Sequence, residues 1–600
     1  MIPSRIAKKK TFDAPPKAPR FWLPAAVLIF FPAALIPLSL RDAWFTNEAS
    51  LLLPNAFVLA AGASALLGFG LLVSRRLSAA FEDHAASAAR AGATSHRAWM
   101  GAAFLGAAGG AALLKYWQYR SGQLPEDSAA IANVAFNFWD HGGFETSVFG
   151  LPSYFAIHFM PVIALFAPIG RLGGLLGMLV AQAVLLCAAP FAVYALVRLK
   201  TGSAIAGLAA WWLALTSPLF FLAARASLAP QVCLPAFLLW AVYCAETGRW
   251  KATAALVLLG AACTEQAPLV FAGAGLWAAL RWPSRRGKLG GVAAAAAAVA
   301  LWRCEWGVIH SFARPYDFWG AFYARLGPSP RAGLENVLHH PLAFAKSLVW
   351  PPAHLAPLAK AFGSTGLFAL AAPFELIPFF VAFAPHLAAD PSTFYHNLDL
   401  HYAAYVLAPL YWATALGAAA VWARLKKSGQ ERLLLGYALV AGGLNLMLEP
   451  PLLMQGRGPQ LFWGVPVLAP KIPPDASVWA LEYAAAPLAF RKNIQLIYGD
   501  GAVGKPGAVL FKPDYVLIDV TYLIEPYKAE QRARMATFLS REGFGAVATT
   551  QTMYLLGRRE APAPGAPLEP LGALPEPNDE GRAYEAMMRE SLLAPLQQSH

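Results

Sequence analysis

Long apolar stretches recur along most of the chain, and short polar segments separate them. A helix needs about 20 apolar residues to cross a lipid bilayer. Nine stretches come close to that length, namely residues 21–40, 51–74, 98–115, 172–198, 202–223, 228–246, 289–309, 402–424 and 432–454. This pattern predicts a polytopic membrane protein built from α-helices.

Two further apolar regions predict pairs of short helices. Thr264, Glu265 and Gln266 interrupt residues 252–281, so we expect two helices that meet at one membrane face. Several prolines interrupt residues 344–384, where we expect another pair. With both pairs, the total is about thirteen spans of the length that a bilayer requires.

The pattern changes after residue 454 to alternating strand-like and helix-like segments. Residues 471–557 therefore predict a small α/β domain. The predicted strands are 477–481, 493–498, 515–520 and a final strand or hairpin at 546–556. The predicted helices are a short one between the first two strands and a longer one at 529–540. Residues 559–577 are rich in Pro, Ala and Glu and predict a linker, followed by a short helix at 581–596.

Composition supports a membrane protein. Hydrophobic residues make up 58% of the 600 and charged residues 14%, against about 25% charged in soluble proteins. Such a chain is too apolar to be soluble or disordered over most of its length. Its five cysteines lie in apolar stretches, which argues against a disulfide framework. The sequence has no Walker A loop and no HExxH, which argues against an ATP-driven pump or a zinc protease.

The excess of basic residues indicates orientation in a membrane rather than binding to nucleic acid. The formal charge is +13, and the segment before residue 21 carries six Lys and Arg residues. The positive-inside rule therefore places the N-terminus in the cytoplasm of a cell-membrane protein. Alternation then puts the basic loops inside, whereas the outside loop 385–401 has no Lys or Arg. An odd number of spans leaves the C-terminal domain outside the cell.

Ionisable groups gather on the predicted outside face. Nine of the 12 histidines lie between His141 and His401, on or near that face. Long polar loops on one side of a membrane protein are typical of its functional side. The alternative is that these loops are polar only because they are exposed.

The first large outside loop predicts a short amphipathic helix. Asp127 or Ser128 can cap its start, and Gly142 is placed to end it. Helical spacing puts four apolar residues on one face, which are Ile131, Val134, Ala135 and Phe138. We expect this helix to lie on the membrane surface, with Glu126 and Asp127 at its N-terminus.

This segment and several others together resemble a known family. The others are residues 155–161, 263–267, 322–327, the Pro-rich stretch 366–385, and residues 401–405, 472–478 and 514–519. The acidic pair, the amphipathic helix and the terminal Gly142 resemble the first outside loop of GT-C fold glycosyltransferases. The chain more closely resembles a prokaryotic membrane family, the domain of unknown function 2079, which is itself similar to GT-C enzymes. The resemblance covers roughly residues 115–557, and spans 21–40 and 51–74 look like an addition before it.

The resemblance implies an all-α polytopic fold of the GT-C type with a small extracytoplasmic α/β domain. We divide the chain accordingly into an N-terminal extra hairpin and cytoplasmic loop at 1–97, a transmembrane core at 98–455, the α/β domain at 471–557 and a flexible tail at 558–600. The implied activity is transfer of a sugar from a polyprenyl-phosphate donor to an unidentified acceptor, on the extracytoplasmic face. No cofactor, metal or nucleic acid is expected.

The resemblance also implies roles for individual residues. Asp127 is the expected base that takes the acceptor's proton, with Glu126 as its partner or substitute. The expected substrate-binding residues are His158, Glu265, Arg225, Arg325, His401 and Tyr402. Guanidinium groups suit phosphate because they bond it bidentately.

Each of these residues also has a structural alternative. Two carboxylates at a helix start can serve only as caps, and outside arginines can anchor helices to lipid headgroups. His158 can satisfy a loop carbonyl, and Glu265 can lie at the membrane surface. His396, Asp399 and His401 with Asp127 form a weak metal hypothesis, because metal ligands are usually more closely spaced.

Two other classes of function remain open. A transporter or flippase of a lipid-linked or small substrate predicts paired broken helices at the bilayer midplane, which the break at Glu265 would fit. A non-catalytic scaffold would use residues 471–557 to bind a partner. The transporter class does not predict the acidic surface helix.

Overall fold

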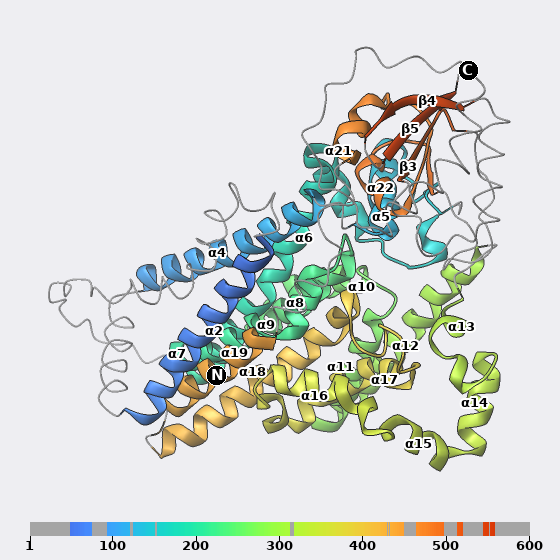
Figure 1. Cartoon of the computed structure of the whole chain (residues 1–600). Coiled ribbons are helices and arrows are strands. Elements are labelled where there is room, and N and C mark those ends of the chain that lie inside the picture. Colours follow the sequence, from blue (N-terminus) through green and yellow to red (C-terminus); the bar gives the residue numbers. More distant parts are fainter. Residues whose placement is uncertain are drawn as a thin grey trace.

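The computed structural model describes residues 49–74, 93–120, 124–149, 153–312, 317–428, 430, 432–448, 464–496, 513–519, 544–550 and 553–558. The predicted span 21–40, the helix 529–540, the linker 559–577 and the terminal helix 581–596 lie outside these residues. The described part is mostly helical, with a small sheet near its C-terminal end (Figure 1).

Most predicted spans correspond to helices. These are α2 (Ala49–Val73), α4 (Ala93–Arg120), α6 (Ile163–Thr201), α9 (Leu234–Glu246), α12 (Arg285–Ser311), α18 (Ala403–Lys427) and α19 (Arg432–Leu448). Basic residues end α18, at Arg424, Lys426 and Lys427, where they oppose the negative end of the helix dipole. Hydrophobic length thus locates these elements well.

Helix breaks occur where proline or polar residues interrupt the apolar pattern. The sequence predicts a single span at 202–223, but α7 (Ala204–Leu215) and α8 (Pro218–Arg225) bend by 52° at Pro218. Pro218 has no N–H to continue α7, whereas its fixed φ suits the first turn of α8. The break predicted around Glu265 is present, between α10 (Trp250–Ala261) and α11 (Ala267–Arg281).

Residues 318–388 form a series of short helices instead of one pair. They are α13 (Phe318–Phe322), α14 (Pro330–His339), α15 (Pro341–Val349), α16 (Ala356–Ser364) and α17 (Ile377–Ala388). A proline stands in the first turn of each of the last four helices. Proline starts helices readily but cannot continue them, so the frequent prolines keep these helices short.

Length and composition alone identify few certain spans. Within the described residues, three helices are long and apolar enough to cross a membrane, namely α6, α12 and α18, or four if the bent pair α7–α8 is one span. Six shorter apolar helices lie beside them. The total of about thirteen spans therefore stays a prediction.

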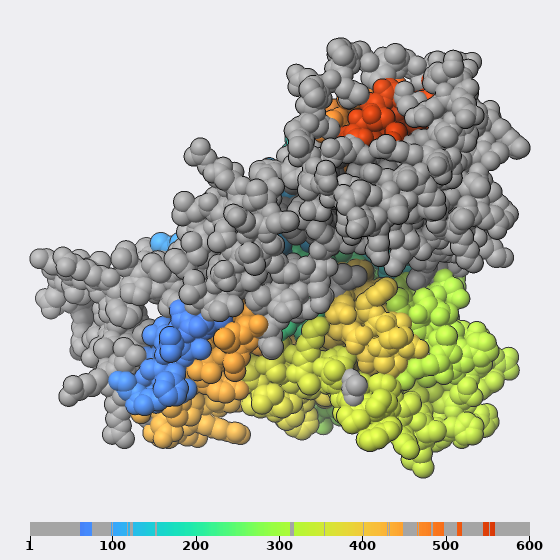
Figure 2. Space-filling view, viewed as in Figure 1, coloured from blue at the N-terminus to red at the C-terminus, as the bar shows by residue number. Residues whose placement is uncertain are grey.

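The helical part has a central and a peripheral layer. Helices α6 and α18 run through the middle, and 72% of the most apolar window of α18 is buried, against 17% in α12. Helices α2 and α19 lie side by side at one edge, as the adjoining blue and orange surfaces in Figure 2 show. Gly68 and Gly436 face each other there, because a Cβ on either would clash with the opposite helix.

The C-terminal sheet has five strands in the order β2-β1-β3-β5-β4. They are β1 (Val478–Ala480), β2 (Ile494–Leu496), β3 (Tyr515–Asp519), β4 (Phe544–Thr549) and β5 (Met553–Arg558). Strand β1 pairs in parallel with β2 and β3, whereas β5 pairs antiparallel with β3 and β4. All four predicted strand segments are present, and the last is a hairpin.

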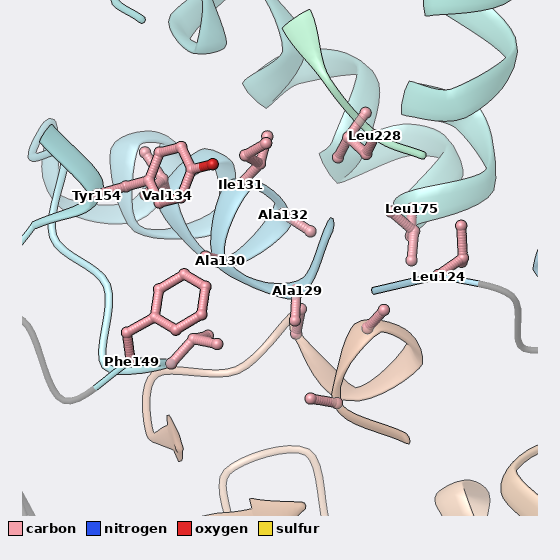
Figure 3. Close-up of a cluster of buried hydrophobic side chains, with 14 of the residues drawn as sticks. Leu124, Ala129, Ala130, Ile131, Ala132, Val134, Phe149, Tyr154, Leu175 and Leu228 are labelled. Atoms are coloured by element: carbon pink, nitrogen blue, oxygen red, sulfur yellow. The ribbon is translucent and has the colours of Figure 1, made fainter. Parts of the chain in front are cut away.

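Helix α5 (Glu126–His141) is buried, which corrects the expectation of a helix on the membrane surface. Residues 128–135 are all buried, and exposed residues occur only in the last turn. One apolar cluster joins α5, the start of α6 and the C-terminal sheet. Figure 3 shows Ala129 beside the C-terminal segments and Tyr154 beside the opposite side of α5. The predicted terminator is correct, because Gly142 has φ 74° and closes the helix onto Phe138.

Asn133, in the middle of α5, holds the sheet to the membrane-side part of the protein. Its Nδ2 donates to the carbonyls of Ala489 and Arg491, at 3.1 and 2.7 Å. Its Oδ1 accepts from Thr146 Oγ1 and the Ser147 amide, at 3.0 and 3.3 Å. The Ser147 side chain bonds to the Ile494 backbone, and the Leu496 amide donates to the Val148 carbonyl, so residues 147–148 lie along β2.

We predict that Asn133→Ala loosens this attachment. The change leaves two buried carbonyls and two buried donors without this partner, at about 1–3 kcal/mol for each group that finds no other. Hydrogen exchange at Ile494 and Leu496 should become faster, while exchange within α18 should not change. Asp140→Ala, at the exposed end of the same helix, is the matched control. Unchanged exchange in β2 of Asn133→Ala would contradict the assignment.

Candidate functional site

Asp127 lies in the first turn of α5 and is half-buried. Tyr154, from the 3₁₀ turn η2 (Tyr154–Ala156), donates its hydroxyl to Asp127 Oδ1 at 3.1 Å. Asp127 does not cap the helix, because Pro125 holds the N-cap position and no side chain bonds there. Glu126 is the first residue of α5, and its side chain is outside the described part.

His158 and Glu265 form a buried pair beside Asp127. His158 Nδ1 and Glu265 Oε1 are 3.0 Å apart, and the Phe159 amide donates to Glu265 Oε2 at 3.2 Å. Glu265 is fully buried in the break between α10 and α11, and His158 is 5% exposed in the loop before α6. The pair thus joins two segments that lie 107 residues apart in the sequence.

The electrostatics of this pair favour a charged imidazole. Burial lowers the pKa of His158, but the Glu265 carboxylate and, more weakly, Asp127 raise it further, so the pKa lies above the usual 6.5. Burial and the neighbouring Asp127 carboxylate raise the pKa of the Tyr154 hydroxyl well above 10.0, so this hydroxyl keeps its proton. Because Glu265 engages Nδ1, the imidazole presents Nε2 on its other side.

His401 and Tyr402 reach the same place from the 3₁₀ turn η8 (Leu400–Tyr402), before α18. The rings of His401 and His158 lie 6.4 Å apart, and those of His401 and Tyr402 lie 4.2 Å apart. Burial and the neighbouring His158 lower the pKa of His401 to about 3, so its imidazole is neutral. Its Nε2 is buried and bonds no group in the described part of the chain. We call Asp127, Tyr154, His158, Glu265 and His401 the acid–histidine cluster.

Arg225 ends α8 and lies on a turn that contacts the start of α5. Ser128 Oγ accepts a hydrogen bond from the Leu228 amide at 3.0 Å, so residues 225–228 adjoin the turn that carries Asp127. Gln118 Nε2 donates to the Arg225 carbonyl at 2.6 Å, and Lys115 Nζ donates to the Ala226 carbonyl. A second basic side chain, buried Lys115, therefore lies beside Arg225.

Arg325 is not part of this cluster. Its guanidinium donates to the carbonyls of Leu387 and Ala388 at the C-terminal end of α17, each at 3.1 Å. Carbonyls at a helix end lack partners within the helix, and an arginine nearby satisfies them and opposes the helix dipole. The geometry gives Arg325 a structural task, while a role in substrate binding stays a prediction.

Sequence reasoning missed two buried charges near the cluster. Lys115 lies near the C-terminal end of α4, and Glu305 lies in α12, where the Glu265 charge influences it. The sequence itself could have indicated both residues. An ionisable residue inside an apolar span is unfavourable to bury and is therefore a functional candidate by default. Both were hidden by assigning their segments as spans from average hydropathy.

The cluster combines groups suited to proton transfer and to binding an anion. A carboxylate, a paired imidazole and a neutral imidazole lie together where α5, the loop before α6, the α10–α11 break and η8 meet. Within the described residues, no group of three or more His, Cys, Asp and Glu side chains has the arrangement of a metal site. A carboxylate can accept a proton, and imidazole N–H groups can donate to an oxyanion.

Comparison with known proteins gives a family and similar solved structures, ArnT among them. The family model described as "Predicted membrane protein (DUF2079)" matches residues 116–456, more than half of the chain. The crystal structure of ArnT from Cupriavidus metallidurans in the apo state is 12% identical, covering 72% of this chain and 92% of that chain with a TM-score of 0.41. A likeness of this extent does not establish a common fold. No curated protein matches the sequence.

The buried pair predicts a pH dependence of stability. The pKa of His158 is raised on folding, so its charged form contributes to the free energy of unfolding. That contribution is fully present below the unfolded pKa of 6.5 and is lost as pH rises through the folded pKa. The unfolding temperature of the purified protein should fall as pH rises from the unfolded pKa to the folded pKa of His158. His158→Asn should flatten the shift there, whereas His339→Asn, at the exposed end of α14, should retain it. An identical profile for wild type and His158→Asn would rule out this ion pair.

Proposed function

The chain belongs to the DUF2079 family of membrane proteins, and we propose that it is an integral-membrane glycosyltransferase that uses a polyprenyl-phosphate-linked sugar. The acceptor is a hydroxyl compound of unidentified structure, and the lipid bilayer delivers the donor. The reaction takes place at the acid–histidine cluster. The proposal deliberately leaves the sugar open, because the described residues carry no feature specific to one sugar.

One observation carries this proposal. Asp127, His158, Glu265 and His401 come from four segments far apart in sequence, yet contacts and electrostatic interactions link them in one buried cluster. Burying ionisable groups together costs stability unless they are paired or functional. A purely structural protein would gain more from apolar residues at these positions.

The proposed reaction is a single displacement. The acceptor oxygen attacks the anomeric carbon and forms the new glycosidic bond, while the bond from that carbon to the phosphate oxygen breaks. Asp127 takes the proton of the acceptor hydroxyl, with Glu126 as its partner or substitute. Polyprenyl phosphate leaves with the electron pair of the broken bond. Attack opposite the leaving group inverts the configuration of the sugar.

Charged and polar groups around Asp127 stabilise the leaving phosphate in this scheme. His158 donates a hydrogen bond from Nε2, and Glu265 holds its imidazole in position through Nδ1. Arg225 supplies a second positive charge from the adjoining turn. His401 and Tyr402 contact the substrate from the start of α18. Preorganised donors of this kind act strongly in a site that excludes water.

The membrane arrangement belongs to the same proposal. We place the N-terminus in the cytoplasm, about thirteen spans in the cell membrane and the cluster and C-terminal sheet on the outside. Residues 1–97, 98–455, 471–557 and 558–600 are the proposed divisions of the chain. The shared core of α5 and the sheet makes the α/β unit a wall of the site rather than an independent module.

A transporter is the second candidate, and one feature favours it. Glu265 is fully buried at a break between two short apolar helices, as ion-coupled transporters require of a binding residue. The two functions differ in their products. A transporter moves an unchanged substrate across sealed vesicles, whereas a glycosyltransferase releases free polyprenyl phosphate.

We predict that Asp127→Asn abolishes transfer while the protein still folds. Asparagine keeps the size of the side chain and still accepts the bond from Tyr154, but it cannot take a proton. Loss of a general base commonly lowers rates by about 10²–10⁴-fold. The measurement is release of polyprenyl phosphate by purified protein in lipid nanodiscs. Asp140→Asn, in the same helix, should be fully active. Full activity of both Asp127→Asn and Glu126→Gln would refute the assignment of the base.

The proposed orientation predicts which residues an impermeant thiol reagent reaches. Cys304, the one exposed cysteine among the five, is first changed to Ser. In intact cells, cysteine at Asp140 or Ser392 should then react, and cysteine at Ser284 should react only after the membrane is opened. All three positions are exposed, so access depends on the side of the membrane. Labelling of the Ser284 position in intact cells would reverse the orientation.

A further inference from the structure

Glu305 is a buried carboxyl group without a hydrogen-bond partner among the described residues. It is 4% exposed in the apolar helix α12, and its Oε2 is sealed from solvent and unbonded. Its neighbours Arg303 and Cys304 are exposed on the other side of the helix. An unpaired carboxyl group of this kind is rare in a protein interior, because desolvation without a hydrogen bond is unfavourable.

Glu305 faces the acid–histidine cluster. The buried positions of α12 are Gly291, Ala298, Glu305 and Ile309, which share the face toward the core. Trp306 contacts Phe318 with ring centroids 5.4 Å apart, and Phe318 contacts His158 at the same distance. The charge of Glu265 also acts on Glu305. This part of α12 therefore forms a wall of the site.

The same wall carries unsatisfied donors as well as an unsatisfied acceptor. Trp302 and Trp306 each have a buried indole Nε1 with no partner in the described part of the protein, and their rings lie 6.5 Å apart. A bound metal ion would leave the indole N–H groups without an acceptor. Hydroxyl groups both donate and accept, so a polyhydroxylated ligand satisfies all three residues.

We propose that Glu305 binds hydroxyl groups of the sugar carried by the lipid donor. This inference rests on the proposed function and assigns the sugar end of the donor to α12. The carboxyl group accepts from sugar hydroxyls, the indole N–H groups of Trp302 and Trp306 donate to them, and the tryptophan rings offer apolar faces to the sugar. The phosphate of the donor lies toward His158 and Arg225. Glu305 is thus a specificity residue and takes no part in proton transfer.

The test compares two lipids on the full-length protein in nanodiscs. The first is bare polyprenyl phosphate. The second is a sugar-bearing lipid, taken in turn from a panel of polyprenyl-phosphate hexoses and pentoses. Wild type should bind at least one sugar-bearing lipid more tightly than the bare lipid. Glu305→Leu should weaken that binding by about 10- to 100-fold, as loss of a partner does for buried hydrogen-bonding groups. Binding of bare polyprenyl phosphate should stay unchanged.

Two further variants separate a binding role from a structural one. Glu305→Gln retains size and hydrogen-bonding capacity, so it should recover part of the affinity for the sugar-bearing lipid. Cys304→Ser, on the exposed side of α12, should bind both lipids as wild type does. Thermal unfolding of each variant shows whether it is folded.

The inference is overturned if folded Glu305→Leu keeps the wild-type preference for a sugar, or if it loses affinity equally for both lipids. It is also overturned if wild type binds no sugar-bearing lipid more tightly than the bare one. The proposed function fails separately. If wild type binds a sugar through Glu305 but releases no polyprenyl phosphate with any acceptor, sugar binding stands and transfer does not.

Discussion

Helix α5 is stable only while both of its faces are covered, and the rest of the site depends on that condition. An isolated helix of 16 residues is marginal in water, so its stability must come from packing. One side of α5 packs toward Tyr154 and the start of α6, and the other packs against the C-terminal sheet. Burial of the Asn133 amide without partners would be unfavourable, but its Nδ2 donates to the carbonyls of Ala489 and Arg491. The sheet, in turn, gains a partner for its edge strand β2 from residues 147–148. The position of Asp127 is therefore fixed by residues more than 350 positions away in the sequence.

The His158–Glu265 pair makes a second connection of this kind, between the loop before α6 and the break between α10 and α11. A helix break in an apolar region leaves amides and carbonyls that need partners, and Glu265 takes the Phe159 amide as well as His158. Removing either partner would leave the other buried and unpaired, which costs far more than the pair contributes. Conversely, apolar residues of similar size could hold these segments together equally well. The presence of a charged pair here is thus better explained by chemistry than by stability.

The sequence predicts features that depend on local periodicity, and it misses those that depend on distant partners. Apolar length locates α2, α6, α12 and α18, and alternation locates the strands. Gly142 ends α5 because a left-handed residue at a helix end favours glycine. The burial of α5 could not be foreseen, because the residues on its second face, such as Ala129 and Ala132, are small and do not distinguish a buried surface from an exposed one. Arg325 looks like a phosphate ligand until the carbonyls of α17, about 60 residues away, are seen to occupy it. The family resemblance points to Asp127, His158, Glu265 and His401 as candidates, but their proximity comes from the fold.

The first turn of α5 separates two electrostatic environments. Successive residues on a helix point roughly 100° apart, because there are 3.6 residues per turn. Asp127 consequently bonds Tyr154 on the side of the acid–histidine cluster, whereas Ser128 bonds the Leu228 amide on the side of Arg225 and Lys115. A carboxylate thus lies one residue away from the position in α5 that contacts the basic turn. The proposed donor has a matching division, since its phosphate is anionic and its sugar is neutral and hydroxylated. Lys115 lies on the same side as Arg225, where its amino group donates to Gln118 and to the Ala226 carbonyl. Among the described residues, no carboxylate pairs with this amino group.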